Sequence, residues 1–362
     1  MPTAITQIAG RQIAAEKIPS WREMEEIWYP KHLSLEQCSS EITARYKARL
    51  SQGDSLTDLT GGFGIDCSFL ATGFKSATYV ERQEELCEIA AHNFPILNLN
   101  HINVRNEDGV AYLQTMSPVD CIFLDPACRN EHGGKTVSIA DCEPNVAELE
   151  DLLLSKASRI MIKLSPMLDL SLALKELKHT QEVHILSVNN ECKELLILLG
   201  QTSPAEITIH CVNLFTKGTQ EEQHFVFTRE QEQRSQCTYT DSLGDYLYEP
   251  NASLLKAGAF RSIAAAYPVR KLHPNSHLYT SDTFIENFPG RIFRIVNQCS
   301  FNKKEVKENL ADLKKANVTV RNFPATVAEL RKRLHLTEGG DTYLFASTLN
   351  NGQKVIIRCE KV

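Results

Sequence analysis

The chain has 362 residues, with 42% hydrophobic and 23% charged residues, which are ordinary values for a globular protein of two or three domains. The N-terminus has no basic stretch followed by an apolar core, so we expect no signal peptide. No apolar run reaches the roughly 18 residues of a membrane-spanning helix, so we expect no membrane span.

The net charge of −6 hides an uneven distribution along the chain. Residues 291–362 contain 14 Lys and Arg against 7 Asp and Glu, a net charge of +7. Residues 1–290 contain 25 against 38, a net charge of −13. A basic module joined to an acidic body favours a polyanionic partner, although a solvated basic face would explain the charge equally well.

The 11 cysteines are irregularly spaced and form no C-x-x-C pair. An odd number at such spacing indicates reduced thiols in a cytoplasmic protein rather than a disulfide framework or a zinc site. We therefore predict a cytoplasmic location and no metal centre.

Residues 1–50 are expected to form a helical segment, because 20–28 and 34–50 have helical spacing with Ser20 and Ser34 as caps. Residues 51–232 alternate short apolar runs with amphipathic stretches, which is typical of an open and largely parallel α/β sheet. The expected strands are 55–60, 76–81, 103–106, 119–125, 159–165, 182–188, 206–215 and 223–228, the last two forming an antiparallel hairpin at the sheet edge.

The rest of the chain divides into a small segment, 233–290, entered through a polar linker, and a C-terminal segment, 291–362, of α+β character. In the C-terminal segment we expect strands at 291–299 and 318–323, helices at 302–317 and 326–334, a capping box at Thr326 and Glu329, and a final hairpin at Asn350-Asn351-Gly352.

A glycine-rich turn, DLTGGFGID (58–66), follows the first expected strand and precedes a helix. Its glycines allow a tight turn and the close approach of a ligand. The stretch departs from the dinucleotide fingerprint, because Cys67 stands where the third glycine belongs. The leading Asp58 suits a cationic part of a ligand, such as the amino group of S-adenosylmethionine.

Acidic residues follow the next three expected strands as well. Glu81 ends the second strand, 23 residues after Asp58, where a carboxylate can accept hydrogen bonds from a ribose diol. Asp108 follows the third strand and can accept a hydrogen bond from an adenine amino group. Asp125 and Pro126 follow the fourth. Because the carboxyl ends of parallel strands meet in one crevice, we expect these groups to converge.

The series DLTGGFGID, YVER, NEDG and LDPA resembles class I S-adenosylmethionine-dependent methyltransferases, and part of it is close to ribosomal RNA guanine-N2 methyltransferases. More of the chain is similar to a Bacteroidetes group with a methyltransferase core, a ferredoxin-like segment and a C-terminal THUMP-like domain. The similar stretches include 36–48, 140–146, 248–260 and 320–348.

The resemblance implies a Rossmann-like seven-stranded methyltransferase sheet with N-terminal helices and a C-terminal α+β THUMP-like domain. It also implies S-adenosylmethionine as cofactor and, because THUMP domains accompany tRNA-modifying enzymes, an RNA substrate. The implied cofactor contacts are Asp58, Thr60, Gly61, Gly62, Gly64, Glu81, Arg82 and Asp108.

Asp125 and Pro126 would then face the transferred methyl group. Methyltransferases that act on amino groups usually continue this motif with a second proline and an aromatic ring, and both are missing here. Arg129 is a candidate to stack on a base or to hold a phosphate instead.

A second set of residues points to ribose 2′-O methylation, in which a Lys-Asp-Lys-Glu set deprotonates a hydroxyl. Lys47, Asp125 and Lys163, with Glu191 or Glu194, could form that set. Asp-Pro fits the methylation of an amino group better.

The sequence therefore predicts a methyltransferase acting on a base amino group of tRNA or rRNA, with ribose 2′-O methylation or a small-molecule substrate as alternatives. In the C-terminal segment, Arg331 and Arg333 are expected to contact RNA phosphates together with Arg321, Lys314, Lys315 and Lys332.

Overall fold

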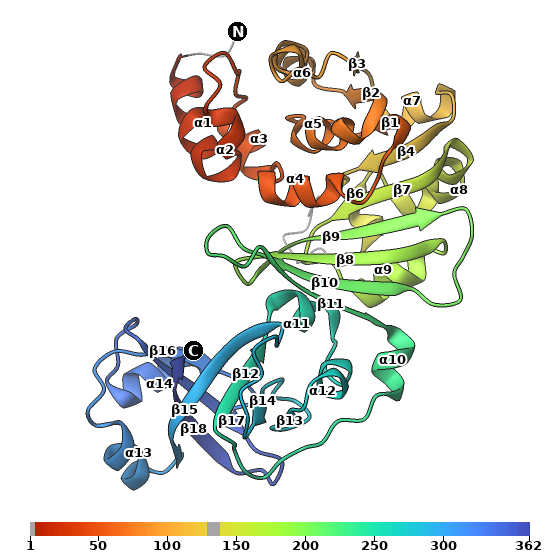
Figure 1. Ribbon diagram of the computed structural model, residues 1–362. Helices are drawn as coiled ribbons and strands as arrows, with labels where there is room; N and C mark the ends of the chain where they lie inside the picture. The colour runs from red at the N-terminus through yellow and green to blue at the C-terminus, as the bar shows by residue number, and fades with distance from the viewer. Residues whose placement is uncertain (1–3, 129–137) are drawn as a thin grey trace. The chain divides into compact units, whose positions relative to one another are not determined.

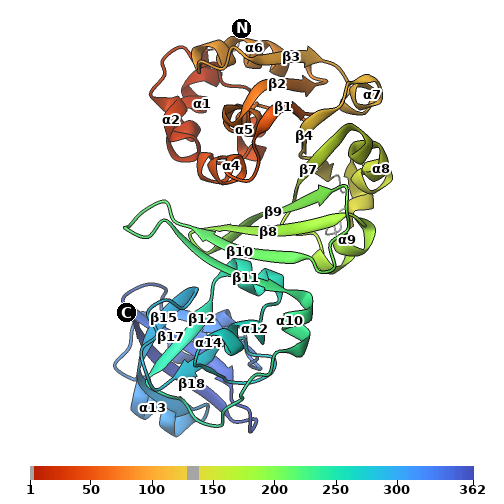
Figure 2. The same ribbon diagram turned by 45° about the vertical axis from the view of Figure 1, so that its right-hand side comes forward.

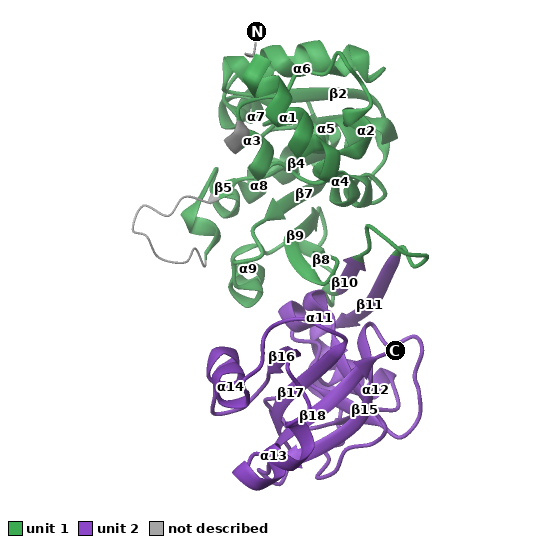
Figure 3. Cartoon of the chain, turned by 90° about the vertical axis from the view of Figure 1, so that its left-hand side faces the viewer, with its two compact units in different colours: residues 1–208, 214–221 green, residues 209–213, 222–362 purple. Residues whose placement is uncertain are grey.

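The computed structural model describes residues 4–128 and 138–362. These residues form two compact units (Figure 3). The first unit contains residues 1–208 and 214–221, and the second contains residues 209–213 and 222–362. Within the described residues, no helix combines the length and the hydropathy needed to cross a bilayer.

The N-terminal segment forms four helices that pack against α5 and α6 through buried side chains such as Trp21, Tyr29 and Leu35 (Figure 1). The segment is helical as expected, and α1 lies in a part of it for which no separate helix was specified. The helix expected at 20–28 ends at Arg22, and Ser20 and Ser34 lie inside helices instead of capping them. The helix expected at 34–50 is interrupted at Cys38–Ser40, where the Ser39 side chain bonds to Asp66. The helices are α1 (Ala4–Lys17), α2 (Pro19–Arg22), α3 (His32–Gln37) and α4 (Glu41–Ala48).

The expected α/β class is confirmed by a sheet in the order β11-β10-β8-β9-β7-β4-β1-β2-β3. β1 pairs in parallel with β2 and β4, and further parallel pairs join β2 to β3 and β4 to β7. The described part of the chain thus contributes nine strands to this sheet, one more than the eight expected from the apolar runs and two more than the seven that the resemblance implies. They are β1 (Gly53–Asp58), β2 (Phe74–Glu81), β3 (Ile102–Asn106), β4 (Val119–Leu124), β7 (Ala157–Leu164), β8 (Thr180–Val188), β9 (Glu191–Gly200), β10 (Thr208–Leu214) and β11 (Glu222–Thr228).

Strand β9 is the element that the sequence analysis missed. It lies between β7 and β8 and is antiparallel to both. Asn189 and Asn190 join it to β8 with φ values of 50° and 68°, as a two-residue hairpin turn requires. The strand carries Glu194 into the interior of the first unit.

Helices between the strands complete the first unit (Figures 1 and 2). Leu70 and Ala71 at the end of α5 pack on a sheet face that includes Leu56, Phe123 and Met161. The elements are α5 (Ile65–Leu70), η1 (Ala71–Gly73), α6 (Glu84–Ile96), α7 (Gly109–Thr115), α8 (Val146–Lys156) and α9 (Leu170–Glu176), with the short pieces β5 (Ala127–Cys128), η2 (Ile139–Asp141) and β6 (Cys142–Glu143).

The second unit contains its own sheet, in the order β13-β14-β12-β15-β18-β17-β16. The expected capping box of Thr326 and Glu329 is confirmed, as is the final hairpin, in which Gly352 has a φ of 85°. The elements are α10 (Arg229–Arg234), β12 (Tyr246–Pro250), α11 (Ala252–Ala257), α12 (Ser262–Ala266), β13 (Arg270–Lys271), β14 (Tyr279–Ser281), β15 (Gly290–Ser300), α13 (Lys303–Leu310), β16 (Asn317–Val320), α14 (Val327–Leu334), β17 (Thr342–Thr348) and β18 (Lys354–Lys361).

Candidate active site

A cavity of about 990 Å³ opens in the first unit at the carboxyl ends of β1, β2, β4 and β7. The four acidic positions expected from the sequence all line it, as does the segment between α3 and α4. The residues that it brings together include Asp58, Thr60, Gly61, Gly62, Gly64, Glu81, Arg82, Asp108, Asp125, Pro126 and Lys163.

Asp58 is the most deeply buried acid of the cavity wall, with 1% of its surface exposed. Its Oδ1 accepts a hydrogen bond of 3.0 Å from the Thr60 backbone N–H, whereas its Oδ2 is buried and has no hydrogen-bond partner. Burial raises the pKa of Asp58 well above its usual value, because little surrounds the carboxylate to compensate its charge. A cationic ligand group at Oδ2 would supply that compensation.

Two glycines of the turn after β1, Gly61 and Gly64, lie close to neighbouring aromatic rings. A Cβ added at Gly61 would lie 2.2 Å from the Tyr79 ring. Gly64 has a φ of 85°, in the left-handed region that favours glycine, and it precedes the first residue of α5. The turn therefore presents bare backbone to the cavity.

Glu81 and Asp108 are tied to the backbone around them. The Glu81 carboxylate accepts hydrogen bonds of 2.9 Å from the backbone N–H groups of Gly62 and Gln83. Asp108 uses its Oδ1 to cap α7, accepting from two backbone N–H groups at 3.0 Å. Arg82 forms an ion pair of 3.2 Å with Glu143. These contacts orient the two acidic groups at the cavity wall.

Asp125 lies where β4 ends, and its backbone N–H donates to the Thr60 hydroxyl at 2.6 Å. Its carboxylate forms an ion pair with Lys163 at the end of β7. Burial raises the pKa of Asp125, although the Lys163 ammonium acts in the opposite direction. The β1 turn therefore fixes the backbone of Asp125, and Lys163 on β7 fixes its carboxylate.

Lys163 is held as an ammonium. Burial alone would lower its pKa, but the carboxylates of Asp125, Asp66 and Glu194 outweigh that effect and raise the pKa above its usual value. A lysine in this state donates hydrogen bonds and does not accept a proton.

Lys163 belongs to a group of side chains that we call the buried charge network. Its members are Ser39, Lys47, Asp66, Lys163 and Glu194. Lys47 is fully buried; its Nζ donates to both Glu194 carboxylate oxygens, at 2.9 and 2.8 Å, and pairs with Asp66 at 2.9 Å. The Ser39 hydroxyl donates to Asp66 at 2.6 Å and accepts from Lys47 at 2.9 Å and from Lys163 at 3.1 Å.

The pKa of Asp66 reflects the same neighbours. Burial would raise it, but Lys47 and Lys163 together hold it below its usual value. Two ammonium groups therefore face three carboxylates, those of Asp66, Asp125 and Glu194.

The structure brings the expected Lys-Asp-Lys-Glu set together and selects between its two glutamates. Glu194 is the buried member, whereas Glu191 is exposed and pairs with Lys193. Within this set, Lys47 is fully buried and pairs with Glu194 at 2.8 Å.

Sequence reasoning missed Ser39 and Asp66. Both lie in stretches that were recognised for other reasons, Asp66 as the last residue of the glycine turn and Ser39 within 36–48. Arg129 falls outside the described residues.

The expectation of reduced thiols throughout is wrong at one position, because Cys142 is disulfide-bonded. Its backbone pairs with that of Cys128 in the two-stranded sheet of β5 and β6, beside Pro126. The irregular spacing of the cysteines gave no indication of this bond.

Comparison with known proteins extends these observations. A family model described as a ferredoxin-like domain matches residues 246–289, and one described as THUMP domain-like matches residues 290–361. The crystal structure of a candidate methyltransferase from Porphyromonas gingivalis is 37% identical in sequence; the match covers 99% of this chain and 89% of that chain, with a TM-score of 0.90. The chain belongs to the family of that protein. It is a class I methyltransferase with a C-terminal THUMP-like domain.

Two more distant matches each cover 44% of this chain. An rRNA methylase from Streptococcus thermophilus is 13% identical, with a TM-score of 0.32 over 44% of this chain and 93% of that chain. A candidate methyltransferase from Streptococcus mutans in complex with SAH is 12% identical, with a TM-score of 0.32 over 44% of this chain and 96% of that chain. Similarity at this level carries no further conclusion. A search of curated proteins finds no match.

The THUMP-like domain of the methyltransferase contains the arginines that were expected to contact phosphate. Arg331 forms an ion pair of 3.1 Å with Glu338, and the Arg333 guanidinium lies 4.1 Å from the centre of the Phe301 ring. Arg321 pairs with Glu249 at 3.1 Å. Several lysines of this domain are more exposed than Arg321 and Arg331. They include Lys303, Lys304, Lys307, Lys314, Lys315 and Lys332.

Proposed function

We propose that this methyltransferase transfers a methyl group from S-adenosylmethionine to a base amino group of structured RNA, with tRNA and rRNA as the leading candidates. The observation that carries the proposal is the position of Asp125. It lies at the end of β4 on the cavity wall and beside Pro126, and Lys163 and Thr60 hold it in place.

The acidic residues that line the cavity suit the polar groups of this cofactor. Asp58 offers a buried acceptor, Oδ2, that has no protein partner and matches the amino group of the methionine portion. Glu81 lies at the end of β2, where it would accept from the ribose hydroxyls. The oxygen of Asp108 that does not cap α7 would accept from the adenine amino group. The bound cofactor would supply an electrophilic methyl group on a positively charged sulfur.

The chain's own residues then perform three tasks. Asp125 accepts a hydrogen bond from the target amine, so that the nitrogen lone pair points at the methyl group. As the new N–C bond formed, the bond between the methyl group and sulfur would break with its electron pair returning to sulfur, and the nitrogen would lose a proton to Asp125, whose raised pKa suits it as an acceptor. Solvent would then remove that proton. Lys163 keeps the carboxylate oriented throughout, while Thr60 holds the backbone of Asp125.

Ribose 2′-O methylation remains a second candidate because Lys47, Asp125, Lys163 and Glu194 do come together. A ribose hydroxyl is a poor nucleophile until its proton is removed, so that reaction needs a base. Lys163 is protonated, and Lys47 is fully buried. An amine needs only orientation and a late proton acceptor, which Asp125 provides.

An RNA substrate is supported by the basic C-terminal segment, whose net charge is +7. Exposed lysines on and near α13 would contact phosphates, and such contacts contribute affinity rather than sequence preference. Arg331 and Arg333 would add to them from α14.

The test uses RNA from a strain that lacks the protein. We expect the purified protein to transfer a ¹³C-labelled methyl group from S-adenosylmethionine to this RNA, and mass spectrometry of the digested nucleosides to place the label on a base. Label on the ribose would favour the second candidate. Absence of label from all nucleosides would contradict the proposal.

A further inference from the structure

We propose that Ser39, Lys47, Asp66 and Glu194 are positioning residues, which hold the Lys163 ammonium in place and thereby set the orientation and charge of Asp125. The N-terminal helical segment, which supplies Ser39 and Lys47, is on this account part of the active site. The inference rests on the methyl-transfer role proposed for Asp125.

The first argument is the saturation of the Ser39 hydroxyl. It makes one donated and two accepted hydrogen bonds, which is the full capacity of a hydroxyl group. Its partners are Asp66, Lys47 and Lys163. If any one of them moves, either its hydrogen bond to Ser39 breaks or Ser39 moves with it and breaks its bonds to the other two. The position of Lys163 is therefore coupled to groups that do not reach the cavity, such as Lys47.

The second argument concerns the cost of burying charge. Lys47 is fully buried, Glu194 is 4% exposed and Asp66 is 8% exposed. A buried ion pair is often no more stabilising than well-packed apolar side chains of similar size. Stability alone therefore does not explain why charges occupy these positions, whereas control over Asp125 does.

The third argument is the direction in which the network acts on Asp125. Lys163 contacts the carboxylate directly, and Lys47 favours its charged form from behind, while Asp58 and Asp66 disfavour it. Loss of Lys47 would leave Asp66 and Glu194 without their shared partner. Their negative charge would then oppose the ionisation of Asp125 and compete for Lys163.

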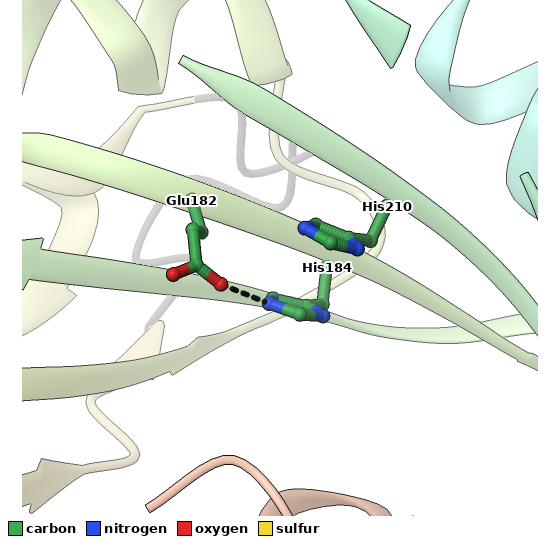
Figure 4. Close-up of side chains that lie close together, drawn as sticks. All are labelled: Glu182, His184 and His210. Carbon is green, nitrogen blue, oxygen red and sulfur yellow. Dashed lines mark hydrogen bonds and ion pairs between the residues drawn. The ribbon is translucent and has the colours of Figure 1, made fainter. Parts of the chain in front are cut away.

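A matched control is adjacent in the sequence. Tyr46 precedes Lys47 on α4, and its buried hydroxyl lies 2.8 Å from Nδ1 of His184 on β8. His184 in turn bonds to Glu182 through Nε2 at 3.1 Å (Figure 4). Tyr46→Phe therefore removes a buried polar contact between α4 and the sheet without altering the network.

The first measurement is methyl transfer to total RNA from a strain that lacks the protein. Ser39→Ala removes all three hydrogen bonds of the hydroxyl; it should lower kcat by about tenfold and leave KM for S-adenosylmethionine within about twofold. Tyr46→Phe should lower the melting temperature without changing kcat. If Ser39→Ala keeps the wild-type kcat, or if Tyr46→Phe lowers kcat equally, the positioning role is refuted.

The second measurement needs no RNA substrate, so it separates this inference from the proposed function. The titration of Asp125 can be followed by ¹³C NMR of aspartate-labelled protein, with Asp125→Asn to assign the signal. Lys47→Met should raise the pKa of Asp125 further, and Tyr46→Phe should leave it unchanged. An unchanged pKa in folded Lys47→Met refutes the inference even if RNA methylation is confirmed.

Lys47→Met could unfold the protein, because it leaves Glu194 buried without its partner. The double variant Lys47→Met with Glu194→Leu removes both charges and puts an apolar contact in place of the ion pair. It should fold and still show a lower kcat than the wild type. A wild-type kcat in the folded double variant would also overturn the proposal.

Discussion

Two lysines of the first unit and three lysines of the second unit of this methyltransferase have opposite surroundings. In the first unit, Lys47 and Lys163 are buried and bonded to carboxylates. In the second, Lys303, Lys304 and Lys307 of α13 are exposed. A buried and paired charge fixes geometry, because it cannot move without breaking its bonds. An exposed charge attracts a polyanion by releasing counterions. Substitutions in the first unit should therefore change the chemistry, and those in the second should change affinity.

The sharpest test of this contrast is Asp125→Asn. The amide cannot take up the proton of the target amine and loses its ion pair with Lys163. We expect kcat to fall by about 10² to 10⁴-fold, the range typical of a lost proton acceptor. Calorimetry should show nearly unchanged binding of S-adenosylmethionine. A fall in kcat of less than threefold would mean that Asp125 is not the acceptor.

Asp58→Asn should separate cofactor affinity from stability. A charge-assisted hydrogen bond contributes about 1.5–3 kcal/mol, so S-adenosylmethionine affinity should fall by about 10- to 150-fold. The melting temperature at neutral pH should rise, because the substitution removes a buried acid whose pKa is raised and whose charged form is therefore destabilising. Asp54→Asn, on the exposed part of the same strand, is the control and should change neither quantity. Unchanged affinity in Asp58→Asn would exclude Asp58 from the cofactor site.

The pH profile tests the same groups without mutation. A raised pKa means that Asp125 becomes protonated at a higher pH than an ordinary aspartate. Activity requires the deprotonated form, so kcat should fall as pH decreases through that pKa, by about tenfold per unit below it. This acidic limb should be absent from the residual activity of Asp125→Asn. Its persistence there would assign it to another group.

The smallest effect is expected in the second unit. Replacing Lys303, Lys304 and Lys307 with glutamine should weaken RNA binding by no more than about tenfold. The slope of the logarithm of the binding constant against the logarithm of the salt concentration should become shallower by about one per lysine. The kcat at saturating RNA should not change. Lys75→Gln, at an exposed lysine of the first unit, is the control. If the triple variant lowers kcat and leaves the salt dependence unchanged, the contrast between the units fails.

The sequence was sufficient to predict the strand-end acids because Asp58, Glu81 and Asp125 lie where strands end in buried residues, and Asp108 follows a shorter strand next in the chain order. Asp58, Glu81, Asp108 and Asp125 needed only the rule that parallel strands end on one side of a sheet. The same reasoning missed β9, which follows β8 after only two residues. The Asn189-Asn190 turn was the signal that could have revealed it.

The buried charge network was beyond sequence reasoning for a different reason. Ser39 and Lys163 are 124 residues apart, and no periodicity connects them. The break between α3 and α4 that brings Ser39 to Asp66 lies within a stretch whose spacing is helical. Such contacts depend on tertiary packing, which a local pattern does not encode.

Nucleoside analysis in cells tests the central claim most directly. RNA from a strain lacking this protein should lose one base-methylated nucleoside, which the wild-type gene restores and the gene encoding Asp125→Asn does not. If every modified nucleoside persists in the deletion strain, or if Asp125→Asn restores the missing one, the claim that Asp125 directs methyl transfer to RNA is contradicted.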